Sequence, residues 1–324
     1  MTKRALVTGC TGQDGSYLSE LLLSKGYEVY GLVRRLSVPN LGNIAAIADR
    51  LHLLDADLMD QSSLHAAVKE AQPDEVYSLA AQSFVATSFV QPVLTGEITG
   101  LGVVRLLEAV RAHAPHARVY QASSSEMFGK ADREPQDEST PFHPRSPYGA
   151  AKVFAYWACI NYREAYGLYV SNGILYNHES QRRGLDFVTR KVSHGVARIR
   201  EGLAKTISLG NLDAKRDWGY APEFVDLMWR VLQHKEPDEF IGATNESHSV
   251  REFVEEAFRV AGIGDWEKHV LVEDRHFRPS EVYNLRGDAS KAKRLLGWEA
   301  KTRFRDLVRI MVEADVKLLE GERA

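Results

Sequence analysis

The sequence predicts an α/β protein with a doubly wound parallel sheet and a smaller C-terminal α/β lobe. Short apolar runs alternate with stretches of helical spacing up to residue 176, as in a parallel sheet with helices on both faces. A glycine-rich turn joins the first apolar run to the first helical stretch. The alternation becomes irregular after this part of the chain, so we expect one domain over 1–176 and a second lobe over 177–324.

Residues 4–8 form the first apolar run, and Gly9, Gly12 and Gly15 lead from it into a helical stretch that ends at 25–26. A strand, a glycine turn and a helix in this order are the context that a dinucleotide fingerprint requires. The glycines allow a tight turn and a close approach of the backbone to a pyrophosphate at the positive end of the helix. The sequence therefore predicts a Rossmann-like cofactor site at its start.

The second strand, 27–33, is followed by Arg34 and Arg35. An NAD site usually has an acidic residue about 20 residues after the glycines to hold the ribose 2′-hydroxyl. Two guanidinium groups can instead hold a 2′-phosphate through charge-assisted hydrogen bonds. We therefore predict NADP as the cofactor. The alternative is that one or both arginines are solvated surface charges.

The rest of the first domain continues the alternation. We predict strands at 51–55, 76–80, 118–122 and 170–175, and helices at 44–50, 62–71, 99–112 and 147–166. Residues 80–83 and Ser123 then lie at the carboxyl ends of strands, where ligands collect in open α/β sheets. The polar segment 130–145 is either a mobile surface loop or a substrate lid.

The helix that begins near Ser146 carries a candidate acid/base. Ser146 can cap it through its hydroxyl, and Pro147 suits the first helical position. Tyr148 and Lys152 are four residues apart and share one helix face. An adjacent ammonium favours the phenolate and lowers the pKa of the tyrosine, which would suit acid/base work near neutral pH. A lone pair of this kind is usually an ordinary surface pair, and the preceding cofactor site is what favours catalysis.

Composition and charge narrow the class of protein further. The net charge is −3 with both signs interspersed, so we expect no nucleic-acid partner. No run of about 18 apolar residues occurs, so we expect a soluble, cytoplasmic protein without a membrane partner. Cys10 and Cys159 are expected to be buried packing residues. His178 and Glu179 have no third ligand at a suitable spacing, so no metal site is expected.

In the second lobe the expected elements are less regular. Helices are predicted at 187–201, 222–234, 250–261, 288–296 and 304–320, and strands at 206–209 and 239–243. The last helix has its apolar residues on one stripe, which we interpret as core packing.

Five longer motifs resemble the GDP-mannose 4,6-dehydratase family of the extended short-chain dehydrogenases/reductases. They are Thr-Gly-x-Thr-Gly-Gln-Asp-Gly-Ser-Tyr-Leu (8–18), Gln-Ala-Ser-x-Ser-Glu-Met-Phe-Gly (121–129), Pro-Arg-Ser-Pro-Tyr-Gly-Ala-Ala-Lys (144–152), Gly-Ile-Leu-Tyr-Asn-His-Glu-Ser (173–180) and Leu-Gly-Asn-Leu-Asp-Ala-Lys-Arg-Asp-Trp-Gly (209–219). The resemblance runs nearly end to end. It implies that the C-terminal lobe binds the GDP-sugar, while elements of about 217–245 return to the first domain.

The implied activity is the NADP-dependent dehydration of GDP-mannose to GDP-4-keto-6-deoxymannose. Oxidation at C4 acidifies the C5 proton, a carboxylate removes it, water leaves from C6, and hydride returns to C6. Tyr148 would take the C4 hydroxyl proton, Lys152 would hold the phenolate and the nicotinamide ribose, and Glu126 would be the base at C5. Ser124 stands where the family has threonine and keeps the hydroxyl that positions the ketone.

The resemblance also assigns binding residues, and guanidinium groups suit diphosphates. The implied cofactor contacts are Gly9, Gly12, Gln13, Asp14, Gly15, Arg34, Arg35, Asp57, Leu58, Leu79, Ala81, Ser83, Tyr148, Lys152 and His178. The implied substrate contacts are Ser83, Ser124, Glu126, Asn177, Arg182, Val188, Lys191, Asn211, Arg216, Arg278 and Glu281. The charged residues among them could instead form interface salt bridges. The family has glycine at Ala56 and proline at Gln181, two departures.

Several alternatives remain open from the sequence. A GDP-manno-heptose 4,6-dehydratase is the first, because the sequence does not reveal the room near C6. A nucleotide-sugar 4-epimerase or 4-keto reductase is less favoured, since Glu126 supplies a second base that an epimerase does not need. A catalytically silent NADP-binding regulator would not need Tyr148, Lys152 and Glu126 together. The resemblance further implies a homodimer or homotetramer, in which the loop after Arg35 reaches a neighbour's cofactor.

Overall fold

The structure is a computed structural model that describes residues 2–321 except residues 39, 278 and 283. Its centre is a seven-stranded parallel sheet, which confirms the predicted α/β fold. In spatial order the strands are β11 (Glu239–Gly242), β6 (Val170–Leu175), β5 (Arg118–Ser124), β4 (Glu75–Ser78), β1 (Arg4–Thr8), β2 (Glu28–Val33) and β3 (His52–Asp55). The strand order reverses beside β1, so a ligand crevice is expected at the carboxyl ends of β1 and β4.

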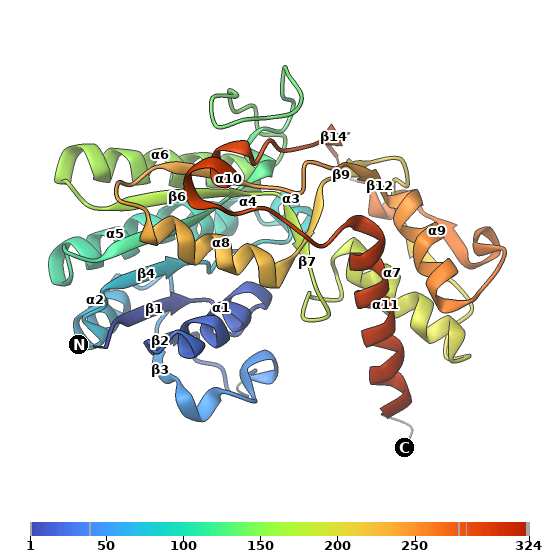
Figure 1. Ribbon diagram of the computed structural model, residues 1–324, viewed down its shortest axis with the longest axis horizontal. Coiled ribbons are helices and arrows are strands. Elements are labelled where there is room, and N and C mark those ends of the chain that lie inside the picture. Colours follow the sequence, from blue (N-terminus) through green and yellow to red (C-terminus); the bar gives the residue numbers. More distant parts are fainter. Residues whose placement is uncertain (1, 39, 278, 283, 322–324) are drawn as a thin grey trace.

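Helices cover both faces of this sheet (Figure 1). One face carries α1 (Gln13–Ser24) and α8 (Ala221–Gln233), which pack on each other, with α10 (Ser290–Leu296) beside α8. The other face carries α2 (Gln61–Ala71), α5 (Gly102–His113) and α6 (Pro147–Tyr166). Each face has its own apolar core, because the strands are buried on both sides. Within the residues described, no helix is long and apolar enough to cross a bilayer.

Local sequence signals explain where α6 begins and ends. The Ser146 hydroxyl accepts a hydrogen bond from the Gly149 amide at 3.0 Å, and Pro147 occupies the first turn. The helix ends at Gly167, whose φ of +67° is the left-handed conformation that glycine adopts without strain. The predicted helix over 147–166 is confirmed.

Two helical predictions need correction. The helix expected at 99–112 is the last part of a longer helical run that begins with α4 (Pro92–Thr95) and passes through a π-helical turn at Gly96–Leu101. The short helix α3 (Val85–Val90) precedes this run and is separated from it at Gln91. The glycines and the proline in this run obscured it in the sequence. The short helix expected at 44–50 is instead two 3-10 turns, Gly42–Ile44 and Ala48–Arg50.

The second lobe has a core of its own, formed by three helices and several short strands. The helices are α7 (Val188–Arg200), α9 (Val250–Ala261) and α11 (Phe304–Gly321). The strands pair as β7 (Asn177–Glu179) with β10 (Trp218–Tyr220), β8 (Ile207–Leu209) with β13 (Val270–Val272), and β9 (Lys215–Arg216) with both β12 (His248–Ser249) and β14 (Asn284–Leu285). In Figure 1 this lobe lies beside the carboxyl ends of the central strands. A cavity there is lined by residues of both halves of the chain.

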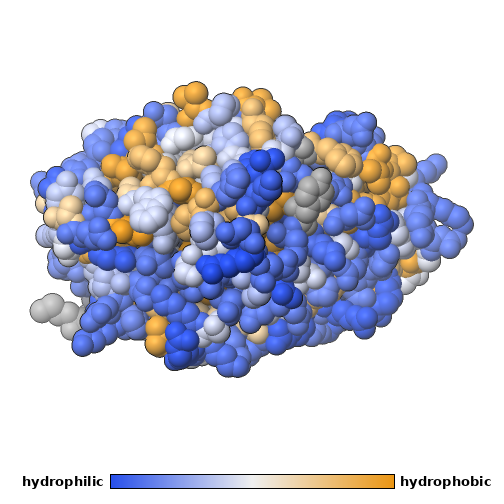
Figure 2. Space-filling view, turned by 90° about the horizontal axis from the view of Figure 1, so that it is seen from above, coloured by the Kyte–Doolittle hydropathy of each residue, from blue (hydrophilic) through white to orange (hydrophobic). Residues whose placement is uncertain are grey.

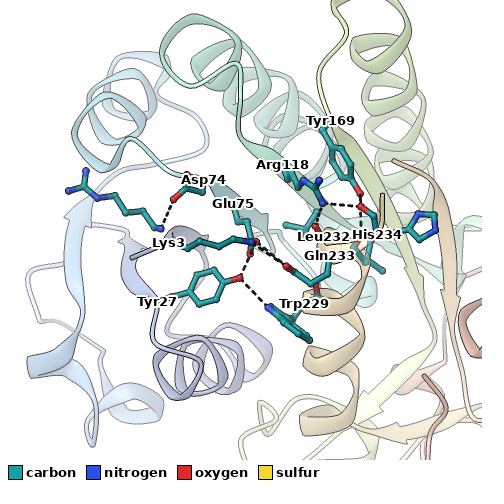
Figure 3. Close-up of polar contacts among 12 residues, drawn as sticks. Lys3, Tyr27, Asp74, Glu75, Arg118, Tyr169, Trp229, Leu232, Gln233 and His234 are labelled. Carbon is teal, nitrogen blue, oxygen red and sulfur yellow. Dashed lines mark hydrogen bonds and ion pairs between the residues drawn. The ribbon is translucent and has the colours of Figure 1, made fainter. Parts of the chain in front are cut away.

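At the opposite edge of the sheet, a buried carboxylate ties α8 to the first strands (Figure 3). Glu75 is 1% exposed. It accepts hydrogen bonds from Lys3 at 2.8 Å, Tyr27 at 3.0 Å, Tyr77 at 2.8 Å and Gln233 at 3.1 Å. Close by, the Arg118 guanidinium donates to the backbone carbonyls of Leu232 and His234 at the end of α8. We call Glu75 and its four donors the Glu75 cluster.

Candidate active site

A cavity of about 1100 Å³ lies between the carboxyl ends of the central strands and the second lobe. The glycine turn, the turn that follows β5, the start of α6 and the segments 175–191 and 209–216 all contribute to its walls. It is therefore lined by both halves of the chain, and the residues expected to contact cofactor and substrate face a common space.

The glycine turn is built for a close approach of its backbone to a ligand. Gly9 has a φ of +69°. A Cβ atom on Gly15 would lie 2.2 Å from the Gly9 carbonyl oxygen, so only glycine fits there. Gly12 precedes α1, and the amino-terminal end of this helix faces the cavity. Free backbone amides and a positive helix end form a site for a pyrophosphate.

The glycine turn is also joined to the second lobe through β7. The Gln13 side-chain amide donates to the His178 carbonyl at 3.0 Å, and Asp14 lies 2.8 Å from His178 Nε2. Burial alone would raise the pKa of Asp14, but the facing His178 lowers this pKa to about 2. In turn, burial opposes protonation of His178, and the Asp14 carboxylate overcomes it and raises the pKa of His178. Each residue therefore stabilises the charged form of the other.

Tyr148 and Lys152 line the cavity together, but their electrostatics correct the prediction from sequence. Burial raises the pKa of Tyr148 to about 12, although a hydrogen bond with Ser124 opposes the rise. The Lys152 ammonium donates to the Ala122 carbonyl at 2.6 Å and lies 5.7 Å from the centre of the Tyr148 ring. Burial lowers the pKa of Lys152 to about 8. In this structure burial therefore outweighs the lowering of the Tyr148 pKa that we expected from the lysine.

The two serines at the end of β5 make different contacts with their hydroxyls. Ser123 donates to the buried Asn172 side chain at 3.2 Å and so faces the neighbouring strand β6. Ser124 accepts from the Glu126 amide at 3.2 Å and shares a hydrogen bond with Tyr148. Ser124 is thus the serine placed beside the acid/base.

Glu126 is held in the cavity wall by a tight contact with α6. Its side chain is 7% exposed and lines the cavity with Tyr148. A Cβ atom on Gly149 would lie 2.7 Å from the Glu126 carbonyl oxygen, so the glycine that follows Tyr148 lets the two segments touch. The carboxylate and the phenol therefore come from rigid, packed elements.

The remaining expected cofactor residues lie along the same cavity, with one exception. Arg34 lines it, whereas Arg35 does not. Asp57, Leu58, Leu79, Ala81 and Ser83 all line it, at the carboxyl ends of β3 and β4 or just beyond.

The substrate side of the cavity includes most, but not all, of the residues expected there. Asn177, Val188, Lys191, Asn211, Arg216 and Glu281 line it. Arg182 does not: its guanidinium points to α1, bonded to Glu20 at 2.7 Å and packed 4.0 Å from the centre of the Tyr17 ring. Arg278 lies outside the described residues.

Comparisons with known proteins agree with the arrangement of residues in this cavity. A sequence model of the family described as GDP-mannose 4,6 dehydratase matches residues 6–311. The chain belongs to that family. "GDP-mannose 4,6 dehydratase 1" of Arabidopsis thaliana is 51% identical over 335 residues, which cover 99% of this chain and 92% of the relative. "GDP-mannose 4,6 dehydratase" of Homo sapiens is 49% identical over 341 residues, which cover 97% and 92%. The solved UDP-glucose 4-epimerase of Thermus thermophilus with NAD is 27% identical, with a TM-score of 0.86 over 96% of this chain and 98% of that one.

This member of the GDP-mannose 4,6-dehydratase family also has cavity residues that sequence reasoning missed. Arg183, the neighbour of Arg182, lines the cavity. It lies 3.3 Å from the buried Glu179 and 3.7 Å from the centre of the Phe187 ring. Arg275 and His276 also line the cavity. Adjacent basic residues such as Arg182 and Arg183 give no sequence signal of which one faces inward. Among the described residues, no group of three or more His, Cys, Asp or Glu side chains could hold a metal ion.

Proposed function

We propose that this protein removes water from GDP-mannose and forms GDP-4-keto-6-deoxymannose. The observation that carries the proposal is the placement of Glu126 beside Tyr148 and Ser124 in a cavity that also contains the glycine turn. Family membership over nearly the whole chain supports the same substrate. We further propose that residues 1–176, with residues of about 217–245, hold the cofactor and that the rest of 177–324 holds the sugar nucleotide.

The cofactor we propose is NADP, within the nicotinamide dinucleotides that the solved relatives contain. The glycine turn fits a pyrophosphate, since a Cβ atom on Gly15 would fill the cradle. Arg34 at the end of β2 would hold the 2′-phosphate, and Lys152 would hold the nicotinamide ribose. When bound, the nicotinamide would accept a hydride from C4 of the sugar and return it to C6, so no cofactor is consumed overall. Arg34→Ala should weaken NADP binding much more than NAD binding, which calorimetry would measure.

The chain's own residues then carry the proton chemistry. Tyr148 would take the proton of the C4 hydroxyl, helped by the hydroxyl of Ser124. Glu126 would remove the proton from C5, which the C4 ketone has made acidic. Departure of the C6 hydroxyl as water needs a proton, and the protonated Glu126 would be positioned to return one. When hydride returns to C6, C5 would take up one proton, which balances the proton that Tyr148 took from the C4 hydroxyl. Arg216 and Lys191 would face the diphosphate and the guanine nucleotide.

The test is to incubate purified protein with GDP-mannose and a trace of NADP⁺. We expect mass spectrometry and NMR to show the loss of one water, a 4-keto-6-deoxy sugar and no net consumption of cofactor. A need for stoichiometric NADPH would contradict the proposal and indicate a reductase. No product from GDP-mannose, with dehydration of GDP-manno-heptose instead, would move the activity to the longer sugar.

We also propose that the protein forms a homodimer or a homotetramer. The outer face of α6 exposes Phe154 at 49% and Trp157 at 57%, and Leu101 nearby is 40% exposed. Figure 2 looks onto the side of the molecule where α6 lies in Figure 1 and shows apolar side chains gathered on an otherwise mostly hydrophilic surface. Large exposed aromatic groups on one rigid helix are typical of protein interfaces.

A further inference from the structure

The segment 130–145, which follows the turn carrying Glu126, is joined to the chain around β14 through the exposed Glu134 and the buried Gln136. Gln136 lies in the middle of this segment and is 2% exposed. Its backbone amide donates to the Arg286 carbonyl at 2.9 Å, and its carbonyl accepts from the Asp288 amide at 2.8 Å. Through these two bonds Gln136 forms a parallel β-bridge with Gly287, in the chain that continues from β14.

The side-chain amide of Gln136 also makes hydrogen bonds, at its oxygen and at its nitrogen. Its Oε1 accepts from the Tyr176 hydroxyl at 2.8 Å and from the Arg286 amide at 3.1 Å. Its Nε2 donates to the Arg133 carbonyl at 3.0 Å. A buried amide with both ends occupied fixes its partners in place, because losing it would leave a buried hydroxyl and a backbone amide unpaired.

Gln136 is connected to the substrate side of the cavity through Tyr176. Tyr176 lines the cavity between β6 and β7. A Cβ atom on Gly287 would lie 2.6 Å from the Tyr176 ring, so the chain after β14 lies against this wall without spare room. The same chain carries Glu281, and the Val282 carbonyl accepts from the Arg216 guanidinium at 2.7 Å. The position of Arg216 therefore depends on the path of the segment that Gln136 holds.

We propose that Gln136 is a positioning residue for the GDP-sugar: it fixes residues 284–288, and with them Arg216 and Glu281, relative to the turn that carries Glu126. The inference rests on the proposed function for the identity of the substrate. The proposal predicts different effects on the binding of GDP and of NADP. The contacts of Gln136 lie on the sugar-nucleotide side of the cavity, and none of them involves the glycine turn. Its loss should therefore weaken the binding of GDP and spare that of NADP.

The experiment compares Gln136→Leu, which keeps the side-chain size but removes the amide, with Gln61→Leu as a matched control. Gln61 is a partly buried glutamine on α2 with a side-chain bond to the Arg105 carbonyl at 2.9 Å, and it does not line the cavity. For Gln136→Leu we expect the Kd of GDP and the KM of GDP-mannose to rise about tenfold. The kcat and the Kd of NADP should change less than about twofold, and Gln61→Leu should change none of these.

Tyr176→Phe is the second variant, because it removes a single hydroxyl from the same network. It should raise the Kd of GDP in the same direction by about threefold, and it decides the matter if Gln136→Leu does not fold. An unchanged Kd of GDP in a folded Gln136→Leu protein, or equal weakening of GDP and NADP, would overturn the proposal. Wild-type protein that binds GDP but does not dehydrate GDP-mannose would refute the proposed function alone, since the comparison of GDP affinities would still stand.

Discussion

In the proposed mechanism, dehydration depends on Glu126, because Tyr148 alone would account only for the oxidation at C4. We expect Glu126→Gln to slow the loss of water by about 10²–10⁴, the usual contribution of a positioned acid/base. Oxidation at C4 should persist, so the absorbance of reduced nicotinamide should appear in a single turnover. Asp132→Asn, an exposed carboxylate on the following loop, is the control and should retain full activity. Full activity of Glu126→Gln would assign Glu126 a structural role.

The ion pair of Asp14 and His178 should make stability depend on pH. The raised pKa of His178 contributes stability below its unfolded value near 6.5, which is lost as the pH rises through the folded pKa. The lowered pKa of Asp14 contributes stability above about 3.9, which is lost as the pH falls toward about 2. Both pKa shifts arise from the same pair of residues. This pair therefore stabilises the folded protein most between about pH 4 and pH 6.5.

We therefore expect Asp14→Asn to lower the free energy of unfolding of the cofactor-free protein by about 1–2 kcal/mol near pH 5.5 and by clearly less near pH 8.5. Urea denaturation across this range measures the difference. Asp49→Asn, in an exposed 3-10 turn, should show no such trend. A loss that is equal at both pH values would show that the pair is not ionised.

For single residues of the site, the sequence could predict which residue types take part but not the environment of each side chain. The spacing of Tyr148 and Lys152 placed both on one face of a helix, and both line the cavity. The pKa of Tyr148 could not be predicted, because it depends on burial by segments far away in the sequence. For the same reason the sequence could not distinguish Arg182, which points to α1, from Arg183, which faces the cavity.

Among the elements, α8 is fastened by the Glu75 cluster, since Gln233 at its end donates to Glu75. Glu75→Leu would leave the buried Tyr77 hydroxyl and other donors without their acceptor. We expect a loss of roughly 3 kcal/mol in the free energy of unfolding, measured by urea denaturation. Glu28→Gln, at a partly exposed pair with Arg4 on the neighbouring strand, should cost less than about 1 kcal/mol. Equal losses in both variants would mean that the burial of Glu75 does not matter.

Long elements with a clear period were predicted well, whereas short ones were not. The helices over 147–166 and 250–261 begin with a serine cap and end before a glycine, and both predictions are confirmed. Strands of two or three residues such as β9 and β14 are too short to show any alternation. They exist because segments distant in the sequence pair with each other, as Lys215 does with Asn284.

For the whole molecule, self-association should depend on the outer face of α6. We expect Trp157→Asp to reduce the mass measured by light scattering, from a dimer to a monomer or from a tetramer to a dimer, because a charge would be buried in the interface. Leu318→Asp is the control, a change of an apolar residue of 48% exposure on α11 in the other lobe. A wild-type protein that is monomeric at micromolar concentration would contradict the proposed oligomer.

The return of β11 to the central sheet limits how this chain can be divided. β11 pairs with β6 along Asn172 to Leu175, and β6 is buried over its whole length. A fragment ending at residue 176 would leave this strand with an open, apolar edge, which invites pairing with other chains. Gene fragments that encode the two lobes separately should therefore yield aggregates, and domain exchange between relatives should succeed only if the stretch from α8 to β11 travels with the first domain.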